Sequence, residues 1–316
     1  MGQLFIFVIL QCKRTCKVTI PIRSNIESVA IPFKGILLDA YGVFWQGGAA
    51  GLIPGAKEAM KKLVLSGKIV GILSNTTQLA RKEIDKVQAH GLHLGEHFHF
   101  FVTSGEIAKE IFSSETLPFP SPKKRFWLFG KQHPRFSSYK ALFEGTKYEE
   151  TSTLSEADFI YISIPHLWGK DQIDPKVFQE EINKIQDSDI PMICVNPDRF
   201  AHEGDPLQAV VRQGTIAALF KEGGGEVFYT GKPEIIAYQM AMKQFSFHET
   251  ILPHEVLMVG DTPETDIRGG KKAGMSTALI IQTGIMADRI KLMGLDTAIK
   301  DCLFGDLPDF FVERLG

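Results

Sequence analysis

The feature of this sequence that most constrains its fold is the alternation of short apolar runs with longer amphipathic segments. Residues 35–38 (GILL) and 68–73 (KIVGIL) are apolar runs, and between them 54–67 has the apolar spacing of a helix. A helical pattern over 78–90 and an apolar run over 97–105 continue the series. Buried strands that alternate with helices are typical of a parallel sheet with crossover helices. We therefore predict an α/β fold built on a parallel sheet.

The order of strand-like and helical segments changes at about residue 121. Strand-like segments follow at 123–130, 157–165 and 190–198, with a helical pattern over 174–188 before the last of them. This stretch has its own strands and helix, so it can form a small domain by itself. We predict that it is inserted into the α/β core.

The earlier alternation resumes after this stretch. Residues 214–233 read as helix, glycine-rich turn and strand, and 233–245 as a further helix. The apolar runs 256–260 and 276–284 read as two strands, with a helix that begins near Asp266 between them. The second half of the chain is therefore predicted to complete the core that the first half began.

The composition suits two domains and excludes some classes of partner. The chain has 316 residues, of which 44% are hydrophobic, enough for a packed core. Its 35 Lys and Arg against 37 Asp and Glu give a formal net charge of -2. A protein that binds nucleic acid or an anionic membrane would show a basic excess. We therefore expect small molecules or other proteins as partners, and no nucleic acid or membrane.

Neither the N-terminus nor the cysteines indicate a targeting signal or a structural metal. The apolar run at 4–10 is far shorter than the roughly 20 residues that span a bilayer, and no small-residue cleavage site follows it. Cys12 and Cys16 lack further ligands for zinc, whereas Cys194 and Cys302 lie in apolar stretches typical of buried thiols. We expect a cytoplasmic protein in which 1–25 is an N-terminal extension.

Polar residues follow directly on three of the predicted strands. They are Asp39, the pair Ser74 and Asn75, and Asp261. In an open parallel sheet the ligand binds at the carboxyl ends of the strands, so these side chains should converge. Each of them alone is also an ordinary turn residue. The lysine in the sequence TGKP, Lys232, adds a cation to the set and favours a functional site.

These residue types fit the chemistry of phosphoryl transfer. Asp39 and Asp261 would repel each other, and a divalent cation with a preference for oxygen ligands, such as Mg²⁺, would hold them together. Asp266 is placed either to support that metal site or to cap the next helix. Ser74, the Asn75 backbone and Lys232 would bind phosphate oxygens. Asp39 could then attack phosphorus to form an aspartyl-phosphate.

At these residues the sequence resembles the haloacid dehalogenase superfamily, whose four motifs occur in order. They read LDAYGV at 38–43, LSNT at 73–76, TGKP at 230–233 and VGDTPETD at 259–266. The sequence is similar in particular to the class IIA branch, the nitrophenylphosphatase-like and NagD-like sugar and nucleotide phosphatases. The segments typical of that branch are IPGA at 53–56, TSG at 103–105, NPD at 196–198 and GKP at 231–233.

The resemblance implies a Rossmann-like core with an inserted cap domain of the C2 type. The core is expected at 26–108 and 205–316, and the cap, which would set substrate specificity, at 109–204. By the same likeness, Asp39 is the nucleophile, and Mg²⁺ is held by Asp39, the Tyr41 main-chain carbonyl and Asp261. Asp266 would support these metal ligands without binding the ion itself. The substrate would be a small phosphorylated metabolite, a sugar phosphate or a nucleotide. A homodimer formed through the cap is also implied.

Tyr41 departs from the family pattern. Phosphatases of this family usually have aspartate there, which protonates the leaving group and later activates water. The pKa of a phenol is about 10, which makes it a poor base at neutral pH, and loss of a positioned acid or base costs about 10²–10⁴-fold. Two alternatives therefore stay open: a protein that binds a phosphorylated metabolite without turnover, and a 2-haloacid dehalogenase, in which DAYG is the usual first motif.

Asn196 and Asp198 occupy the point where the chain is expected to return from cap to core. Their sequence, NPD, suits a hinge turn, and a role facing the substrate is the alternative. The histidines that could replace the missing acid, His166, His202 and His254, lie in loop-like contexts and are expected to be surface or structural residues.

Overall fold

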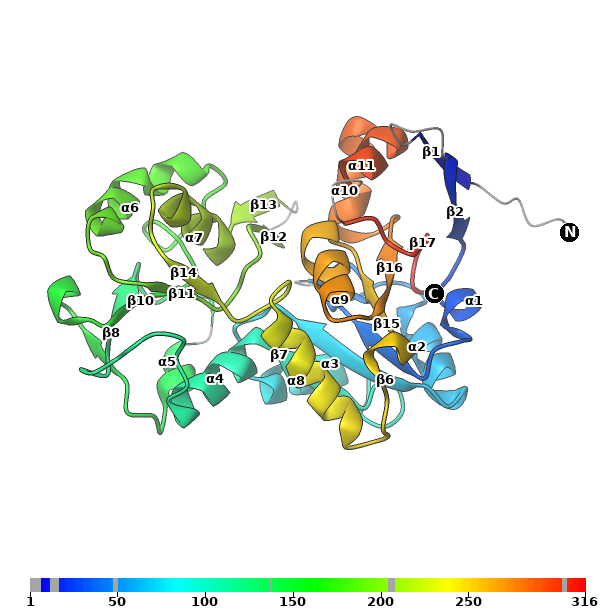
Figure 1. Ribbon diagram of the computed structural model, residues 1–316, viewed down its shortest axis with the longest axis horizontal. Helices are drawn as coiled ribbons and strands as arrows, with labels where there is room; N and C mark the ends of the chain where they lie inside the picture. The colour runs from blue at the N-terminus through cyan, green and yellow to red at the C-terminus, as the bar shows by residue number, and fades with distance from the viewer. Residues whose placement is uncertain (1–6, 12–16, 48–50, 137, 204–207, 303–305) are drawn as a thin grey trace, which may run out of the picture. The chain divides into compact units, whose positions relative to one another are not determined.

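The computed structural model describes residues 7–11, 17–47, 51–136, 138–203, 208–302 and 306–316, arranged in two compact units (Figure 1). The first unit takes the described residues of 1–74, 84–102 and 238–316. The second takes those of 75–83 and 103–237. The chain therefore leaves the first unit and returns to it, so the second unit is an insertion.

The first unit is built on a sheet of eight strands in the order β1-β2-β17-β16-β15-β3-β6-β7. Every pairing that joins β2, β17, β16, β15, β3 and β6 is parallel, and β1 pairs antiparallel to β2. The central strands β3 and β15 are buried along their whole length, as expected for strands covered on both faces. The strand bounds are β1 Phe7–Gln11, β2 Lys17–Arg23, β3 Gly35–Leu38, β6 Ile69–Ser74, β7 Phe100–Thr103, β15 Val256–Gly260, β16 Ser276–Ile280 and β17 Phe310–Val312.

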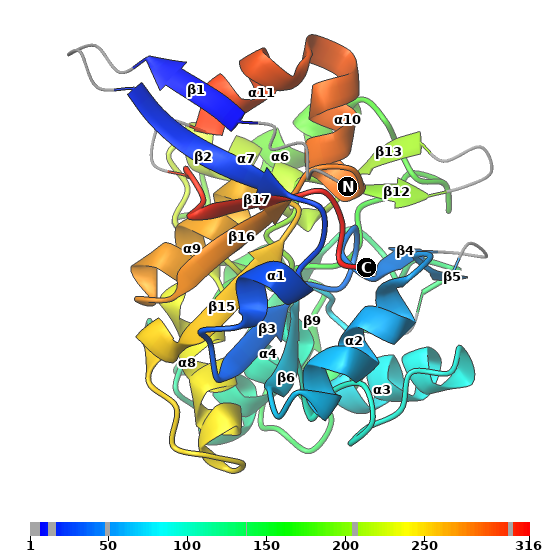
Figure 2. The same ribbon diagram turned by 90° about the vertical axis from the view of Figure 1, so that its right-hand side faces the viewer.

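Helices cover both faces of this sheet. In Figures 1 and 2, α1 and α2 lie on one side of β15, and α8 and α9 on the other. Apolar residues of α1 and α2 pack on Ile36, Leu38 and Val259, while α10 and α11 pack on the opposite face through Leu279 and Phe311. The bounds are α1 Glu27–Ala30, α2 Ala56–Leu65, α3 Ala80–Ala89, α8 Ile235–Ser246, α9 Arg268–Lys272, α10 Gly284–Met293 and α11 Leu295–Cys302; a short antiparallel pair, β4 Trp45–Gly47 and β5 Gly51–Leu52, precedes α2.

The second unit has its own parallel sheet of five strands, in the order β14-β11-β10-β8-β9. Helices α6 and α7 contribute to one apolar cluster, and α4 and α5 to another. The bounds are β8 Arg125–Phe129, β9 Glu149–Thr151, β10 Phe159–Ile162, β11 Met192–Cys194, β14 Val227–Tyr229, α4 Ser104–Ser114, α5 Lys140–Phe143, α6 Gln179–Gln186 and α7 Gln213–Glu222; the hairpin is β12 Phe200–Glu203 and β13 Gln208–Val211. The α/β fold with an inserted cap is thereby confirmed.

Helix α7 and strand β14 belong to the second unit of the structure, and the core limits 26–108 and 205–316 remain a prediction. β14 pairs in parallel with β11, so it extends the sheet of the second unit. A short apolar run such as VFY indicates a strand but does not indicate which sheet that strand joins. The limits 109–204 for the cap domain itself remain a prediction.

The predictions for the N-terminal extension, the cysteines and membrane-spanning segments can be compared with the described residues. Of the expected extension at 1–25, the structure describes β1 and β2, which lie at the edge of the first sheet. Cys12 and Cys16 lie outside the described residues. Cys194 and Cys302 are buried free thiols, and burial raises the pKa of both. Among helices of the described residues, none has both the length and the apolar character required to cross a bilayer.

We expect Gly71→Ala to destabilise the first unit, because there is no room for a side chain at this point of β6. A β-carbon at Gly71 would lie 2.1 Å from the ring of Phe100. Overpacking of this kind costs about 1–3 kcal/mol, which urea denaturation would measure as a lower free energy of unfolding. The double variant Gly71→Ala with Phe100→Leu should recover part of the loss. Unchanged stability of the single variant would contradict this packing.

Candidate active site

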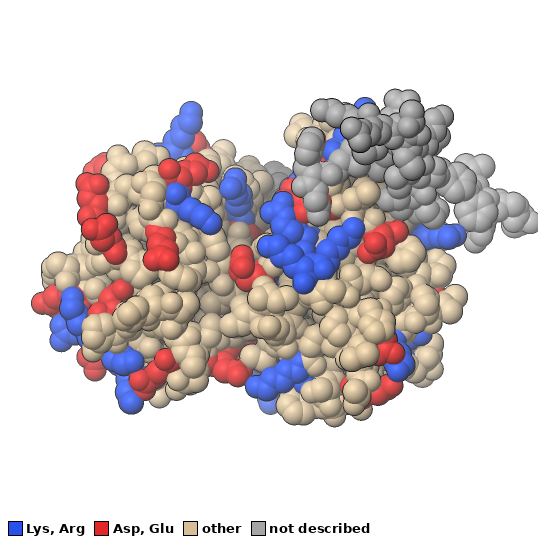
Figure 3. All heavy atoms as spheres, in the orientation of Figure 1, with Lys and Arg blue, Asp and Glu red and all other residues tan. Residues whose placement is uncertain are grey.

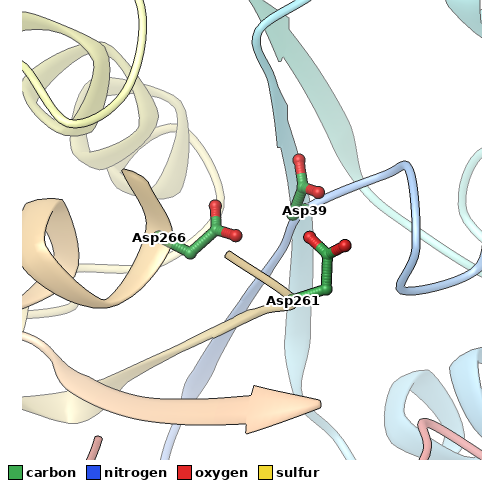
Figure 4. A group of neighbouring side chains, drawn as sticks. All are labelled: Asp39, Asp261 and Asp266. Carbon is green, nitrogen blue, oxygen red and sulfur yellow. The ribbon is translucent and has the colours of Figure 1, made fainter. Parts of the chain in front are cut away.

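Three carboxylates meet at one end of the first unit's sheet. Figure 4 shows Asp39 and Asp261 side by side, with Asp266 directed toward them from a neighbouring turn. One oxygen from each lies within 4.8 Å of the others, and the three residues are only 8%, 3% and 1% exposed, respectively. The structure therefore brings together three residues that the sequence marked as site candidates.

The register of the sheet explains why Asp39 and Asp261 meet. β3 and β15 are parallel neighbours, with Leu38 opposite Val259. The N–H of Asp39 donates to the carbonyl of Val259 at 2.8 Å, which carries the pairing one residue beyond β3. Both aspartates thus follow strands that end at the same level of the sheet, as the rule for parallel sheets predicts.

Asp261 is held in place by its surroundings. Its Oδ2 accepts a hydrogen bond from the N–H of Ile285 at 2.7 Å, and its Oδ1 accepts one from Thr262 Oγ1 at 3.1 Å. A β-carbon at Gly42 or Gly284 would lie 2.2 or 1.9 Å from Oδ2, and both glycines have positive φ. Two backbone turns therefore close on this carboxylate where no side chain would fit.

Asp266 lies in a single π-helical turn, Pro263–Ile267, that precedes α9. Its Oδ2 accepts a hydrogen bond from the N–H of Thr262 at 3.1 Å. Its carbonyl oxygen lies 3.2 Å from the hydroxyl of Tyr238, which donates to it. Burial, together with the charges of Asp266 and Asp39, raises the pKa of Tyr238 well above its usual value. Asp266 is thus fixed to the loop that carries Asp261, rather than free to move in solvent.

The carboxylate cluster fits a divalent cation. Burial of three negative charges together is unfavourable unless a cation or protons neutralise them. All the side-chain atoms of the cluster that could bind a metal are carboxylate oxygens, the hard ligands that Mg²⁺ and Ca²⁺ prefer. Asp39, Asp261 and Asp266 are therefore the residues that could hold a metal or support its ligands.

Asn75 is the centre of a separate hydrogen-bond network within the second unit. Its Oδ1 accepts from the N–H of Lys232 at 2.7 Å and from Ser104 Oγ at 3.3 Å. Its Nδ2 donates to the Lys232 carbonyl at 3.2 Å and to Asp198 Oδ1 at 2.8 Å. The amide therefore fixes the backbone on both sides of the Lys232 side chain, which is itself buried. Ser74, the buried last residue of β6, belongs to the first unit.

The glycines of two sequence motifs make room for this network. A β-carbon at Gly231 would lie 2.4 Å from Asn75 Oδ1 and from Ser104 Oγ. A β-carbon at Gly105 would lie 2.3 Å from the carbonyl oxygen of Thr77. The close approach that both glycines permit explains why TSG and GKP occur as motifs here.

Asn196 and Asp198 form a turn next to the network. The N–H of Asp198 donates to Asn196 Oδ1 at 2.9 Å, and its carbonyl oxygen accepts from the N–H of Gly214 at 3.1 Å. Since its carboxylate also accepts from Asn75, Asp198 links the Asn75 network to the start of α7. A role of either residue toward substrate remains a prediction.

Tyr41 is 43% exposed, and its hydroxyl accepts a hydrogen bond from Lys86 Nζ at 3.1 Å. The same ammonium lies 5.2 Å from the centre of the Tyr41 ring and 5.3 Å from that of Trp45, within the range of cation–π contacts. Lys86 is one of two lysines on the amphipathic helix α3, and nothing in the sequence pattern distinguishes it from a solvated side chain.

The remaining charges on the molecule are mixed. Figure 3 shows acidic and basic side chains interspersed over the face in view, with Lys and Arg gathered around α9, whose sequence is RGGKK. Of the loop histidines, His166 is partly exposed and His254 is exposed, while the His202 side chain lies outside the described residues.

Comparison with known proteins finds two family models that match segments of the chain, and relatives that are similar over most of its length. Residues 36–139 match the model of the haloacid dehalogenase-like hydrolase family, and 229–297 match a HAD-hydrolase-like family. Chronophin from Rattus norvegicus is 27% identical over 303 residues, covering 89% of this chain and 85% of chronophin. Sugar-phosphatase AraL from Bacillus subtilis (strain 168) is 27% identical over 256 residues, covering 78% of this chain and 82% of AraL.

The same family appears among solved structures. A hydrolase of the haloacid dehalogenase-like family from Brucella suis 1330 superposes with a TM-score of 0.75 at 17% identity, covering 93% of this chain and all (100%) of that one. At this identity the likeness concerns the fold. The two matched segments of the present chain contain Asp39 in one and Lys232, Asp261 and Asp266 in the other.

We expect a divalent cation to stabilise the protein through the three carboxylates. Addition of Mg²⁺ should raise the melting temperature measured by calorimetry. In Asp261→Asn, with one buried negative charge removed, the metal-free protein should melt higher and the Mg²⁺-dependent rise should shrink.

Glu264→Gln is the matched control, because Glu264 lies three residues after Asp261 but pairs with Arg289 at 2.7 Å. This variant should keep the full rise. An equal rise in Asp261→Asn and the parent protein would show that the cation binds elsewhere.

Proposed function

Because the chain belongs to the haloacid dehalogenase superfamily, in the class IIA branch of NagD- and chronophin-like phosphatases, we propose that it is a Mg²⁺-dependent phosphatase of a small phosphorylated metabolite. The observation that supports this most is the buried cluster of Asp39, Asp261 and Asp266 at the carboxyl end of a parallel sheet. Such a cluster provides both a nucleophile and the ligands of a cation.

In this proposal Mg²⁺ is held by Asp39, Asp261 and the main-chain carbonyl of Tyr41. When bound, the ion neutralises charge on the phosphate and so favours its approach to a carboxylate. Asp266 keeps the loop of Asp261 in place through its hydrogen bond with the N–H of Thr262. Ser74, the Asn75 backbone and Lys232 bind phosphate oxygens. Lys232 is positioned by its N–H, which donates to Asn75 Oδ1, and by its carbonyl, which accepts from Asn75 Nδ2.

The reaction proceeds in two displacements at phosphorus. An oxygen of the Asp39 carboxylate forms a bond to phosphorus, the bond to the ester oxygen breaks, and the alcohol leaves after taking up a proton. Water then attacks the aspartyl-phosphate, which releases inorganic phosphate and restores the Asp39 carboxylate. Both steps need a group that transfers a proton.

Tyr41 occupies the position at which the family usually has an aspartate for this purpose. A phenol with a pKa of about 10 is a weak base at neutral pH, so we propose that turnover is slow, by about 10²–10⁴-fold. The hydrogen bond from Lys86 holds the Tyr41 hydroxyl, which keeps the side chain in one place without providing a carboxylate.

The names of the relatives indicate a broad class of substrate. AraL is named a sugar-phosphatase, and we propose that this protein likewise acts on a sugar phosphate or a nucleotide. The alternatives are a protein that binds such a metabolite without turnover and a 2-haloacid dehalogenase. The three buried carboxylates favour a cation-dependent reaction over a metal-independent dehalogenase.

We expect hydrolysis of p-nitrophenyl phosphate in the presence of Mg²⁺, and its loss in Asp39→Asn, which lacks the nucleophile. Release of p-nitrophenolate measured by absorbance provides the rate. Turnover that is the same in both proteins would refute the role of Asp39. Chloride release from 2-chloropropionate without metal would instead establish a dehalogenase.

We expect Tyr41→Asp to raise the rate of hydrolysis, because it restores a carboxylate at the acid–base position. The gain should fall within about 10²–10⁴-fold, the range attributed to a positioned acid or base. Tyr41→Phe is the control, since it removes the hydroxyl but adds no carboxylate. A rate for Tyr41→Asp at or below that of the parent protein would show that another group transfers the proton.

A further inference from the structure

An open cavity of about 460 Å³ lies wholly within the second unit, next to β9, the edge strand of its sheet. Small-molecule sites typically have volumes of roughly 300–1,000 Å³ and combine apolar walls with a few polar groups. Neither the carboxylate cluster nor the Asn75 network contributes a residue to the lining, so the proposed reaction does not account for this cavity. Its lining comes chiefly from Phe126, Lys140, Phe143, Glu144, Tyr148 and Glu150.

Three buried aromatic residues form the apolar part of this lining. Phe126 on β8 is paired in parallel register with Glu150 on β9, so their side chains lie on the same face of the sheet. The rings of Phe126 and Phe143 are stacked, with their centroids 4.0 Å apart, and Tyr148 lies just before β9. The cavity therefore has an aromatic wall whose rings are held by the core of the unit.

Charged side chains of both signs surround this aromatic wall. Lys140 and Glu144 are exposed, and they are four residues apart at the two ends of the single-turn helix α5, which places them on one side of it. Among the described residues, neither the Lys140 ammonium nor the Glu144 carboxylate has an ion-pair partner. Both charges are therefore available to a molecule in the cavity.

The backbone of α5 and the third charged side chain, Glu150, are fixed before anything binds. Lys109 of α4 donates to the carbonyl of Ala141 at 3.2 Å and to that of Glu144. Burial raises the pKa of Tyr139, so its hydroxyl keeps its proton and donates to the Glu150 carboxylate. A preformed site loses less conformational entropy when a ligand binds.

The charges of the lining limit the class of ligand. One lysine against two glutamates gives the lining a net charge of -1, which disfavours a phosphate ester or another anion. A simple amine would pair with a glutamate and leave Lys140 beside a like charge. A zwitterion with an aromatic body can pair with both signs and also cover the aromatic wall.

We propose that this cavity binds a free aromatic amino acid. Its ring packs against Phe126, Phe143 and Tyr148. Its ammonium pairs with Glu144, and its carboxylate pairs with Lys140. The site lies apart from the residues proposed to act on phosphate, so the inference does not depend on the proposed phosphatase function.

The first test is calorimetry of the full-length protein with L-phenylalanine and three analogues, each of which lacks one part of it. L-Alanine lacks the ring and should bind at least about tenfold more weakly, the loss expected when an aromatic side chain is no longer buried. Phenethylamine lacks the carboxylate and 3-phenylpropionate lacks the ammonium. Each should bind about two- to fivefold more weakly, because each loses an exposed ion pair.

Two variants assign the two charges of the ligand to their partners. Lys140→Met should weaken binding of L-phenylalanine about two- to fivefold without weakening that of phenethylamine. Glu144→Gln should weaken L-phenylalanine to the same extent without weakening 3-phenylpropionate. Glu149→Gln and Lys131→Met are the matched controls, because both residues are exposed and neither lines the cavity; both controls should bind as the parent protein does.

Three results would overturn the inference. The first is no binding of L-phenylalanine, L-tyrosine or L-tryptophan at millimolar concentration. The second is equal affinity for L-phenylalanine in the parent protein, Lys140→Met and Glu144→Gln, with unchanged melting temperatures showing that the variants fold. The third is tighter binding of phenethylamine than of L-phenylalanine, which would indicate a site for cations.

Asp39→Asn separates this site from the proposed reaction. The variant should bind L-phenylalanine as the parent protein does, whether or not the parent protein hydrolyses phosphate esters. Loss of L-phenylalanine binding in Asp39→Asn would place the ligand at the carboxylate cluster and would overturn the inference.

Discussion

The burial of three carboxylates at one end of a parallel sheet is the constraint on which the first unit depends. Like charges so close together are unfavourable, and the surrounding structure is arranged to hold them. Glycines at 42 and 284 allow two backbone turns to lie against the Asp261 carboxylate. Thr262 donates hydrogen bonds to both Asp261 and Asp266. A site organised in this way is suited to a divalent cation.

In the second unit a single uncharged side chain has the corresponding role. One side-chain amide, that of Asn75, joins three segments that are far apart in sequence, those of Ser104, Asp198 and Lys232. Because all of these bonds are buried or partly buried, loss of any partner would leave an unpaired polar group. The Asn75 network is therefore both a structural junction and the support of a proposed phosphate ligand, Lys232.

Sequence reasoning predicted the α/β fold, the insertion and the convergence of Asp39 with Asp261, since each follows from local pattern and the rule for parallel sheets. It did not predict that β14 joins the second sheet, because a three-residue apolar run fits either sheet equally well. It also missed Lys86, which a helical pattern presents as an ordinary surface lysine until the fold places it at 3.1 Å from the Tyr41 hydroxyl.

The sequence by itself determined which chemical groups this protein has at the ends of its strands, including Tyr41 two residues after Asp39. Order along the chain is enough for this, because strand ends are local features. Only the tertiary structure decided that Asp266 lies beside Asp39 in one buried cluster, and that the Asn75 amide joins the segments of Ser104, Asp198 and Lys232. Both depend on contacts between distant segments, which local periodicity does not encode.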